Sequence, residues 1–254
     1  LWKENGRELK EFITNYRREK GFADQWTSQL NAHDFYFTGG VSWSSRPHME
    51  GSFWALPRGV IFGNTGPAVL DSSTDALLWN LAVLNSRAYR SLLDLLMPRG
   101  SSGTQTLKYE LGYVRSVPIP RADDAVTSDT QGLAREILIH LQRLDSGWED
   151  STVFSSITLV PMEEGLQREF IKHRHNVDNA SGAIAQGISK IDHLMEDLYG
   201  LVGGGNRDPL LDLTSVRAST ECFKLHKSLS REGLDEFLQR VVSYLLGTAL
   251  GRWD

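Results

Sequence analysis

The chain has 254 residues, of which 40% are hydrophobic and 23% charged, a composition typical of an ordinary globular protein with a sizeable core. Its single cysteine, Cys222, excludes an internal disulfide framework and a zinc site built from cysteines, and it suits a reducing cytoplasm. No apolar run approaches the roughly 18 residues that span a membrane, and no signal peptide is recognisable. The cysteine usage thus leads us to expect a cytoplasmic location. Because the sequence starts at LWKENG without a methionine and stops abruptly at GRWD, we expect a fragment of a longer protein.

Charge is distributed unevenly along the chain. The formal net charge is −5, but residues 1–122 carry 14 Lys/Arg against 11 Asp/Glu, whereas residues 123–254 carry 13 against 21. Such asymmetry between halves is a weak indication that the basic half binds an acidic partner such as nucleic acid.

The first predicted element is an amphipathic helix from Lys3 to Lys20, which Gly21 can end. Its apolar positions follow the helical spacing: Leu9, Phe12, Ile13 and Tyr16. Residues 33–70 then change in character. Glycines separate short aromatic and β-branched runs, DFYF, VSW, SFWAL and GVIF, and this alternation predicts strands joined by turns.

A leucine-rich helix is predicted next, with Ser73 or Thr74 as its cap and Pro98 after its end. The polar stretch PRGSSGTQTLKYE predicts a loop, and YVRSV a short strand before the Pro-Ile-Pro exit. The acidic segment RADDAVTSDT lacks apolar periodicity, so we expect a solvated linker at Asp123 and Asp124 and a domain boundary near residue 122.

The second half is predicted to be helical. TQGLAREILIHLQRL forms one helix, and a longer one from about Glu163 to Tyr199 has apolar residues every seven positions, as in a helix packed lengthwise on another. Gly182 and Gly187 should weaken it by about 1 kcal/mol each relative to Ala, and VGGGNRDP should end it. In the last helix Ser230 is the expected cap. Its expected buried face is Phe237, Val241, Tyr244 and Leu245.

A search for catalytic motifs finds no Walker loop and no nucleophile elbow. The three glycines at 203–205 follow a helix instead of preceding one, which favours a flexible turn over a phosphate site. His173 and His175 lie two residues apart on a helix and so face different directions, unlike a metal-binding pair. The sequence therefore predicts neither catalytic residues nor a metal site.

Several motifs nevertheless occur in a particular order. VSWSSRPHMEGSFWALPRGVIFGNTGPAVL is followed by a helix containing Leu84-Asn85-Ser86 and by YELGYVRSVPIP, and WKENGRELKEF precedes them. DSGWEDSTVF, ISKIDHLMEDLYGL and VVSYLLGTALGRWD follow. In this order the motifs resemble the C-terminal target-recognition and helical region of adenine-specific DNA methyltransferases from BREX-type phage-defence systems. Fused type II restriction-modification methyltransferases are similar. The resemblance covers nearly the whole chain.

The resemblance implies an α+β fold, with a mixed α/β target-recognition domain at residues 1–122 and a mostly α-helical bundle at 123–254 that supports it. It also implies double-stranded DNA as partner, and the helical half could bind proteins of the defence system. The Asn-Pro-Pro-Tyr motif and the glycine-rich S-adenosylmethionine loop are missing from these residues. We therefore expect no cofactor in this fragment, and S-adenosylmethionine in a catalytic domain of the parent enzyme.

Within that interpretation, two polar loops and one turn supply the candidate DNA-binding residues. Arginine can pair bidentately with guanine and glutamine with adenine, while serine, histidine and lysine can reach bases or phosphates. Arg58, in the turn, could contact phosphate or pair with Asp71. Trp43 and Trp54 are expected in the core in preference to stacking on bases. The loop candidates are Ser44, Ser45, Arg46 and His48 in the first loop and Arg99, Ser101, Ser102, Gln105 and Lys108 in the second.

Two alternatives stay open at this point. The chain could be a protein-interaction module whose heptad helix binds partner subunits, or a specificity subunit of a multi-subunit restriction enzyme. Salt-dependent binding to duplex DNA separates the first alternative from DNA recognition.

Overall fold

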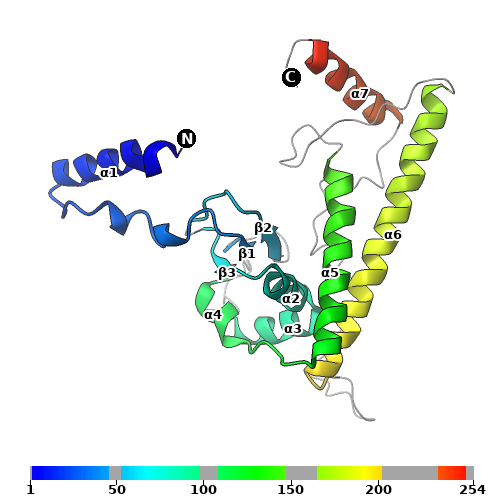
Figure 1. Cartoon of the computed structure of the whole chain (residues 1–254), viewed down its shortest axis with the longest axis horizontal. Coiled ribbons are helices and arrows are strands. Elements are labelled where there is room, and N and C mark those ends of the chain that lie inside the picture. Colours follow the sequence, from blue (N-terminus) through cyan, green and yellow to red (C-terminus); the bar gives the residue numbers. More distant parts are fainter. Residues whose placement is uncertain are drawn as a thin grey trace, which may run out of the picture.

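The structure, a computed structural model, describes residues 2–45, 53–63, 65–97, 108–146, 165–201 and 234–249. A small three-stranded antiparallel sheet is followed by helices, which confirms the predicted α+β class (Figure 1). Within these residues, no helix combines the length and the apolar character needed to cross a membrane.

The N-terminal arm contains the predicted amphipathic helix. The short 3₁₀ segment η1 (Lys3–Gly6) leads into α1 (Arg7–Glu19), and the positive φ of 72° at Gly21 lets the chain turn away. The 3₁₀ segments η2 (Trp26–Ser28) and η3 (His33–Phe35) follow, so the predicted strand at DFYF is wrong. Figure 1 shows α1 apart from the sheet and the other helices.

The sheet has β1 (Gly40–Trp43) at its centre, with β2 (Phe53–Leu56) and β3 (Ala68–Leu70) paired antiparallel on either side. VSW and SFWAL thus form strands as predicted, whereas GVIF does not. A Cβ at Gly40 would lie 2.5 Å from the Val69 carbonyl oxygen, so this position in the centre of the sheet requires glycine.

The leucine-rich segment forms two helices instead of one. Ser73 caps α2 (Thr74–Asn85) by accepting a hydrogen bond from the Ala76 N–H. Ser86 then adopts an extended conformation (φ −65°, ψ 149°), and its hydroxyl accepts from the Tyr89 N–H at the start of α3 (Arg87–Leu96). The break follows from this capping geometry, since a capping residue lies outside the helix that it caps.

The predicted strand at YVRSV is also wrong, because these residues lie in α4 (Leu111–Ser116). β2 and β3 already flank β1 in the sheet, and the Val114 carbonyl accepts a hydrogen bond from the Tyr89 hydroxyl at 2.7 Å. A side-chain contact with α3 therefore holds this segment, with no contribution from a β ladder.

The two long helices are α5 (Asp124–Asp145) and α6 (Leu166–Leu198), which lie side by side in Figure 1. The acidic segment after residue 122 is the first part of α5 and not a linker, because Asp123 caps the helix by accepting from the Val126 N–H at 2.8 Å. The predicted heptad face is confirmed. Its buried members include Val177, Ile184, Ile188, Ile191 and Met195.

One main core extends across residue 122. It includes Val41 of β1, Leu81 of α2, Ile137 of α5 and Met195 of α6. The sheet and the long helices therefore share a single hydrophobic interior, and α2 packs directly against α5.

The last helix, α7 (Leu234–Ala249), contacts α6 through part of its predicted face. Phe237 and Val241 are buried and pack against Phe170, but Leu245 is 45% exposed, so its predicted burial is wrong. Tyr244, the residue before Leu245, is half-buried and packs against this cluster, so Leu245 lies at the exposed edge of the packed face. The predicted cap Ser230 lies outside the described residues.

Candidate nucleic-acid interface

Three segments distant in sequence meet where β1 ends. The Ser45 N–H donates to the Thr65 carbonyl at 3.0 Å, and the Ser45 carbonyl accepts from the Tyr109 N–H at 3.0 Å. Ser44 and Ser45 are half-buried, and Tyr109 is buried. Because the first predicted loop leaves from Ser45 and the second returns at Lys108, the base of one loop is hydrogen-bonded to the base of the other.

The buried side chain of Trp43 stabilises this junction. Its indole N–H donates to the Tyr109 carbonyl at 2.9 Å, and its ring, 1% exposed, packs on Phe53 with a centroid separation of 5.4 Å. A buried indole needs a partner for its N–H, and here that partner also anchors the second loop. The predicted core role of Trp43 is thus confirmed, whereas Trp54 is 43% exposed and does not belong to the core.

The edge strand β2 is held by Asn85 at the end of α2. The Asn85 amide donates to the Phe53 carbonyl at 2.8 Å, and its oxygen accepts from the Phe53 N–H at 3.1 Å. Asn85 also donates to the Leu81 carbonyl at 3.0 Å and is 2% exposed. The first residue of β2 therefore has both backbone groups paired on the side that faces away from β1.

The described candidates divide into two places. Ser44, Ser45 and Lys108 lie at the junction, where Lys108 forms an exposed ion pair with Glu110. Arg58 lies at the other end of β1, where its side chain passes Gly39 and its guanidinium donates to the Ser72 carbonyl at 3.2 Å. The suggested pair of Arg58 with Asp71 is not formed; the Asp71 carboxylate accepts a hydrogen bond from the Ser73 N–H.

The other candidates lie outside the described residues, in the two segments that the sequence predicts to be loops. They are Arg46, His48, Arg99, Ser101, Ser102 and Gln105.

Buried charges attach this platform to the helical half. The Asp192 carboxylate on α6 accepts from the Arg87 N–H, the first of α3, at 2.8 Å, and the Arg87 Nε lies 3.5 Å from the same carboxylate. The carboxylate of Glu196 lies 3.4 Å from the Arg87 Nε. Negative charge at the N-terminus of α3 is favourable for the helix, so α6 both positions and stabilises α3.

Two tyrosine hydroxyls hold the segment after the second loop. Tyr89 donates to the Val114 carbonyl at 2.7 Å, and Tyr199 donates to the Pro118 carbonyl at 2.8 Å. Burial raises the pKa of both phenols above the usual 10.0, and the neighbouring Tyr199 adds to the increase for Tyr89. Both hydroxyls therefore stay protonated and able to donate near neutral pH.

The sequence by itself predicted no structural role for Asn85 or Tyr109. An asparagine among the leucines of α2 was a usable signal, since a buried amide must find hydrogen-bonding partners. Among the residues that the structure describes, no group of three or more His, Cys, Asp and Glu side chains could hold a metal ion. The described residues bring the point where the first predicted loop begins next to the point where the second one ends.

Comparison with known proteins agrees with the order of the motifs. Over its whole length the chain is 22% identical to the adenine-specific methyltransferase PglX of Lacticaseibacillus casei (strain Zhang) and covers 19% of that protein. Over 96% of its length it is 23% identical to the adenine-specific methyltransferase BrxX of Escherichia coli O9:H4 (strain HS), of which it covers 20%. No protein-family model matches the chain. The chain is thus distantly similar to one part of these adenine-specific methyltransferases and spans about a fifth of their length.

Proposed function

We propose that this chain is the DNA-recognition part of a longer adenine-specific DNA methyltransferase of a phage-defence or restriction-modification system. The observation that supports the proposal is the junction at Ser45 and Tyr109, which joins one end of each predicted loop, and both loop sequences are rich in side chains that could read bases. A reader of duplex DNA needs hydrogen-bonding groups at fixed separations, and a shared rigid base provides that separation.

In this proposal the side chains divide by task. Arg46 contacts a guanine edge, Gln105 contacts an adenine, and Ser44, Ser45, His48, Ser101 and Ser102 support them at bases or phosphates. Arg58, Arg99 and Lys108 contact the phosphate backbone, which supplies affinity without sequence preference. A residue before proline favours extended backbone conformations, so the sequence Arg46-Pro47 would lower the entropic cost of presenting the guanidinium.

The remainder of the longer protein would bind S-adenosylmethionine and transfer the methyl group in the cytoplasm. The similarity to methyltransferases supports this division, because the chain covers only a fifth of their length and contains no Asn-Pro-Pro-Tyr motif. The helical half would hold the recognition part in place and contact proteins of the defence system.

Arg46→Ala and Arg58→Ala in the full-length enzyme test the proposal as a contrasting pair. Loss of a bidentate guanine contact removes about 1–3 kcal/mol of discrimination. Arg46→Ala should therefore relax the methylated sequence at one base pair. Arg58→Ala should weaken binding equally for all DNA sequences. It should also reduce the slope of the logarithm of the binding constant against the logarithm of salt concentration by about 1. Sequencing of methylated sites and binding titrations at several salt concentrations measure both effects.

The outcomes separate the alternatives. A DNA affinity that does not change with salt would exclude phosphate contacts and favour the protein-interaction module. An Arg46→Ala enzyme that melts many degrees lower yet methylates the same sites would show that Arg46 has a structural role only.

A further inference from the structure

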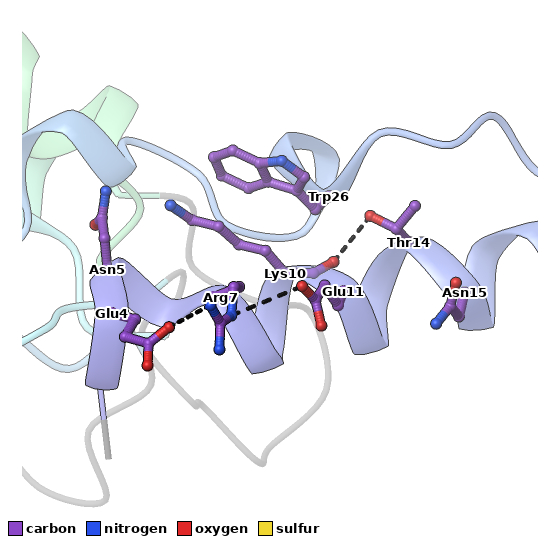
Figure 2. Close-up of a pocket in the computed structure, with 8 residues that line it drawn as sticks. All are labelled: Glu4, Asn5, Arg7, Lys10, Glu11, Thr14, Asn15 and Trp26. Carbon is purple, nitrogen blue, oxygen red and sulfur yellow. Dashed lines mark hydrogen bonds and ion pairs between the residues drawn. The ribbon is translucent and has the colours of Figure 1, made fainter.

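Helix α1 turns its polar side toward the segment that follows it. Lys10 and Thr14 on this side face Trp26 of η2 across an open groove of about 610 Å³ (Figure 2). The Lys10 ammonium lies 4.5 Å from the centroid of the Trp26 ring, and Glu4 and Arg7, which also line the groove, form an ion pair along the helix. The helix is thus held locally through charged and polar contacts.

Most of the apolar side of α1 faces the other way and is open, although Ile13 on that side is buried. Phe12 is 66% exposed, Tyr16 is 51% exposed and Leu9 is 43% exposed, and the Phe12 and Tyr16 rings stack on each other at 6.4 Å. Among the elements that the structure describes, the main packing partners of α1 are η1 and η2, and no α1 side chain enters the main core. Apart from Ile13, the side of this amphipathic helix that would normally pack on a core is therefore left exposed.

The size of this apolar face decides between kinds of occupant. Since a buried aromatic residue covers about 150–250 Å², these partly exposed side chains offer on the order of 300 Å². A stable interface between separate proteins buries about 800 Å² per partner. The face is therefore too small to hold a second copy or a free partner by itself. A segment of the same polypeptide needs less area, because covalent linkage gives it an effective concentration in the millimolar range.

We infer that the apolar face of α1 docks on the catalytic part of the same, longer polypeptide. This inference relies on the proposed function in one respect, that the chain belongs to a methyltransferase about five times its length. Exposed charges at Glu8, Glu19 and Lys20 surround the apolar centre, as the polar rim of an interface does. α1 would then connect the recognition part to the part that performs methyl transfer, through a contact independent of the DNA-reading loops.

Site-specific photo-crosslinking in the full-length enzyme tests the inference. Phe12→p-benzoylphenylalanine places the crosslinker on the apolar face, and Glu11→p-benzoylphenylalanine places it on the polar side as the matched control. Phe12→p-benzoylphenylalanine should crosslink, within one polypeptide, to a peptide outside these 254 residues, with at least tenfold higher yield than the control. Mass spectrometry of the digested product identifies the peptide.

Every other outcome overturns the inference. A crosslink to a peptide within these residues would mean that the chain covers its own helix. A crosslinked dimer would identify a second copy as the occupant, and equal low yields at both positions would mean that the face is bare. The experiment contains no DNA, so its failure is distinct from an absence of salt-dependent DNA binding, which would refute the proposed function instead.

Discussion

The Asn85 side chain pairs with backbone groups of the edge strand β2. β2 pairs only with β1 in the sheet, so its outer backbone groups need other partners, and the Asn85 amide supplies one donor and one acceptor to Phe53. A hydroxyl is too short to reach both groups at once, and a carboxylate has no proton to donate at neutral pH. This residue connects α2 to the hairpin from which the first candidate loop departs.

Asn85→Leu should lower the free energy of unfolding by about 2–4 kcal/mol, because it leaves the buried Phe53 N–H and carbonyl unpaired at about 1–3 kcal/mol each. Urea denaturation measures the change. Asn80→Leu, at a half-buried position in the same helix, is the control and should change the free energy by less than about 1 kcal/mol. Similar losses in both variants would mean that the amide contacts to Phe53 contribute nothing specific.

The two glycines within α6 occupy different environments. A Cβ at Gly182 would meet no atom within 4 Å, whereas a Cβ at Gly187 would lie 3.0 Å from the Ile137 side chain of α5. Ile137 is buried and has little room to move. Gly187 therefore allows α5 and α6 to approach closely, which the sequence-based expectation of two equally weakening glycines did not foresee.

Gly182→Ala should raise the free energy of unfolding by about 0.5–1 kcal/mol, since alanine favours the helix. Gly187→Ala should lose that gain or become destabilising, because Ile137 must shift to make room. Thermal denaturation of the two variants compares them directly. Equal stabilisation by both variants would show that the α5–α6 contact can accommodate a methyl group at Gly187.

At the scale of elements, α7 shows how a periodic pattern can exceed the surface available to it. Phe237 and Val241 are buried with Phe170 and Tyr244 packed against them, and the centroid of the His173 ring lies 5.2 Å from that of the Phe237 ring, but Leu245 is exposed. Spacing identifies which residues share a face, whereas the packing of neighbouring elements decides which of those residues are covered.

Val241→Asp should therefore be severely destabilising, by about 3 kcal/mol or more for the α6–α7 contact, because it places a charge at a buried position. Leu245→Asp should change stability by no more than about 1 kcal/mol, since Leu245 is 45% exposed. Hydrogen exchange of α7 amides reports the local effect. Loss of protection in Leu245→Asp equal to that in Val241→Asp would contradict the exposed position of Leu245.

At the scale of the whole molecule, hydrogen bonds from buried groups connect the sheet region to the long helices. Asp192 of α6 contacts the start of α3, and the hydroxyls of Tyr89 and Tyr199 hold the residues around α4. Together with the shared core, these contacts make the geometry of the loop bases dependent on the helical half.

The tyrosines predict the response to alkaline pH. Burial raises the pKa of Tyr89 and Tyr199 in the folded protein, whereas tyrosines in the unfolded chain ionise near the usual 10.0. The unfolded state thus binds fewer protons above pH 10, so the free energy of unfolding should be constant below about pH 10 and fall as pH rises further. Denaturation at pH 9 and pH 11 measures the fall, which should be smaller in Tyr89→Phe. The same fall in Tyr89→Phe and in the unmodified protein would assign it to other groups.

The sequence by itself determined most of the helices, because their signals are local. The cap at Ser73, the heptad positions of α6 and the glycine after α1 act over a few residues, and each was confirmed. Residue types also defined the chemistry of the two polar loops. Which of those side chains contact DNA stays a prediction.

Only the tertiary structure decided what depends on contacts between distant residues. Residues 111–116 became a helix held by Tyr89, and Ser86 divided the leucine-rich segment by capping α3. The meeting of Ser45 with Tyr109 spans more than sixty residues, and no periodic pattern encodes it. Sequence patterns indicate which side chains prefer to be buried. Hydrogen bonds between distant segments depend instead on how the elements pack. That packing brings one end of each candidate loop to a common base.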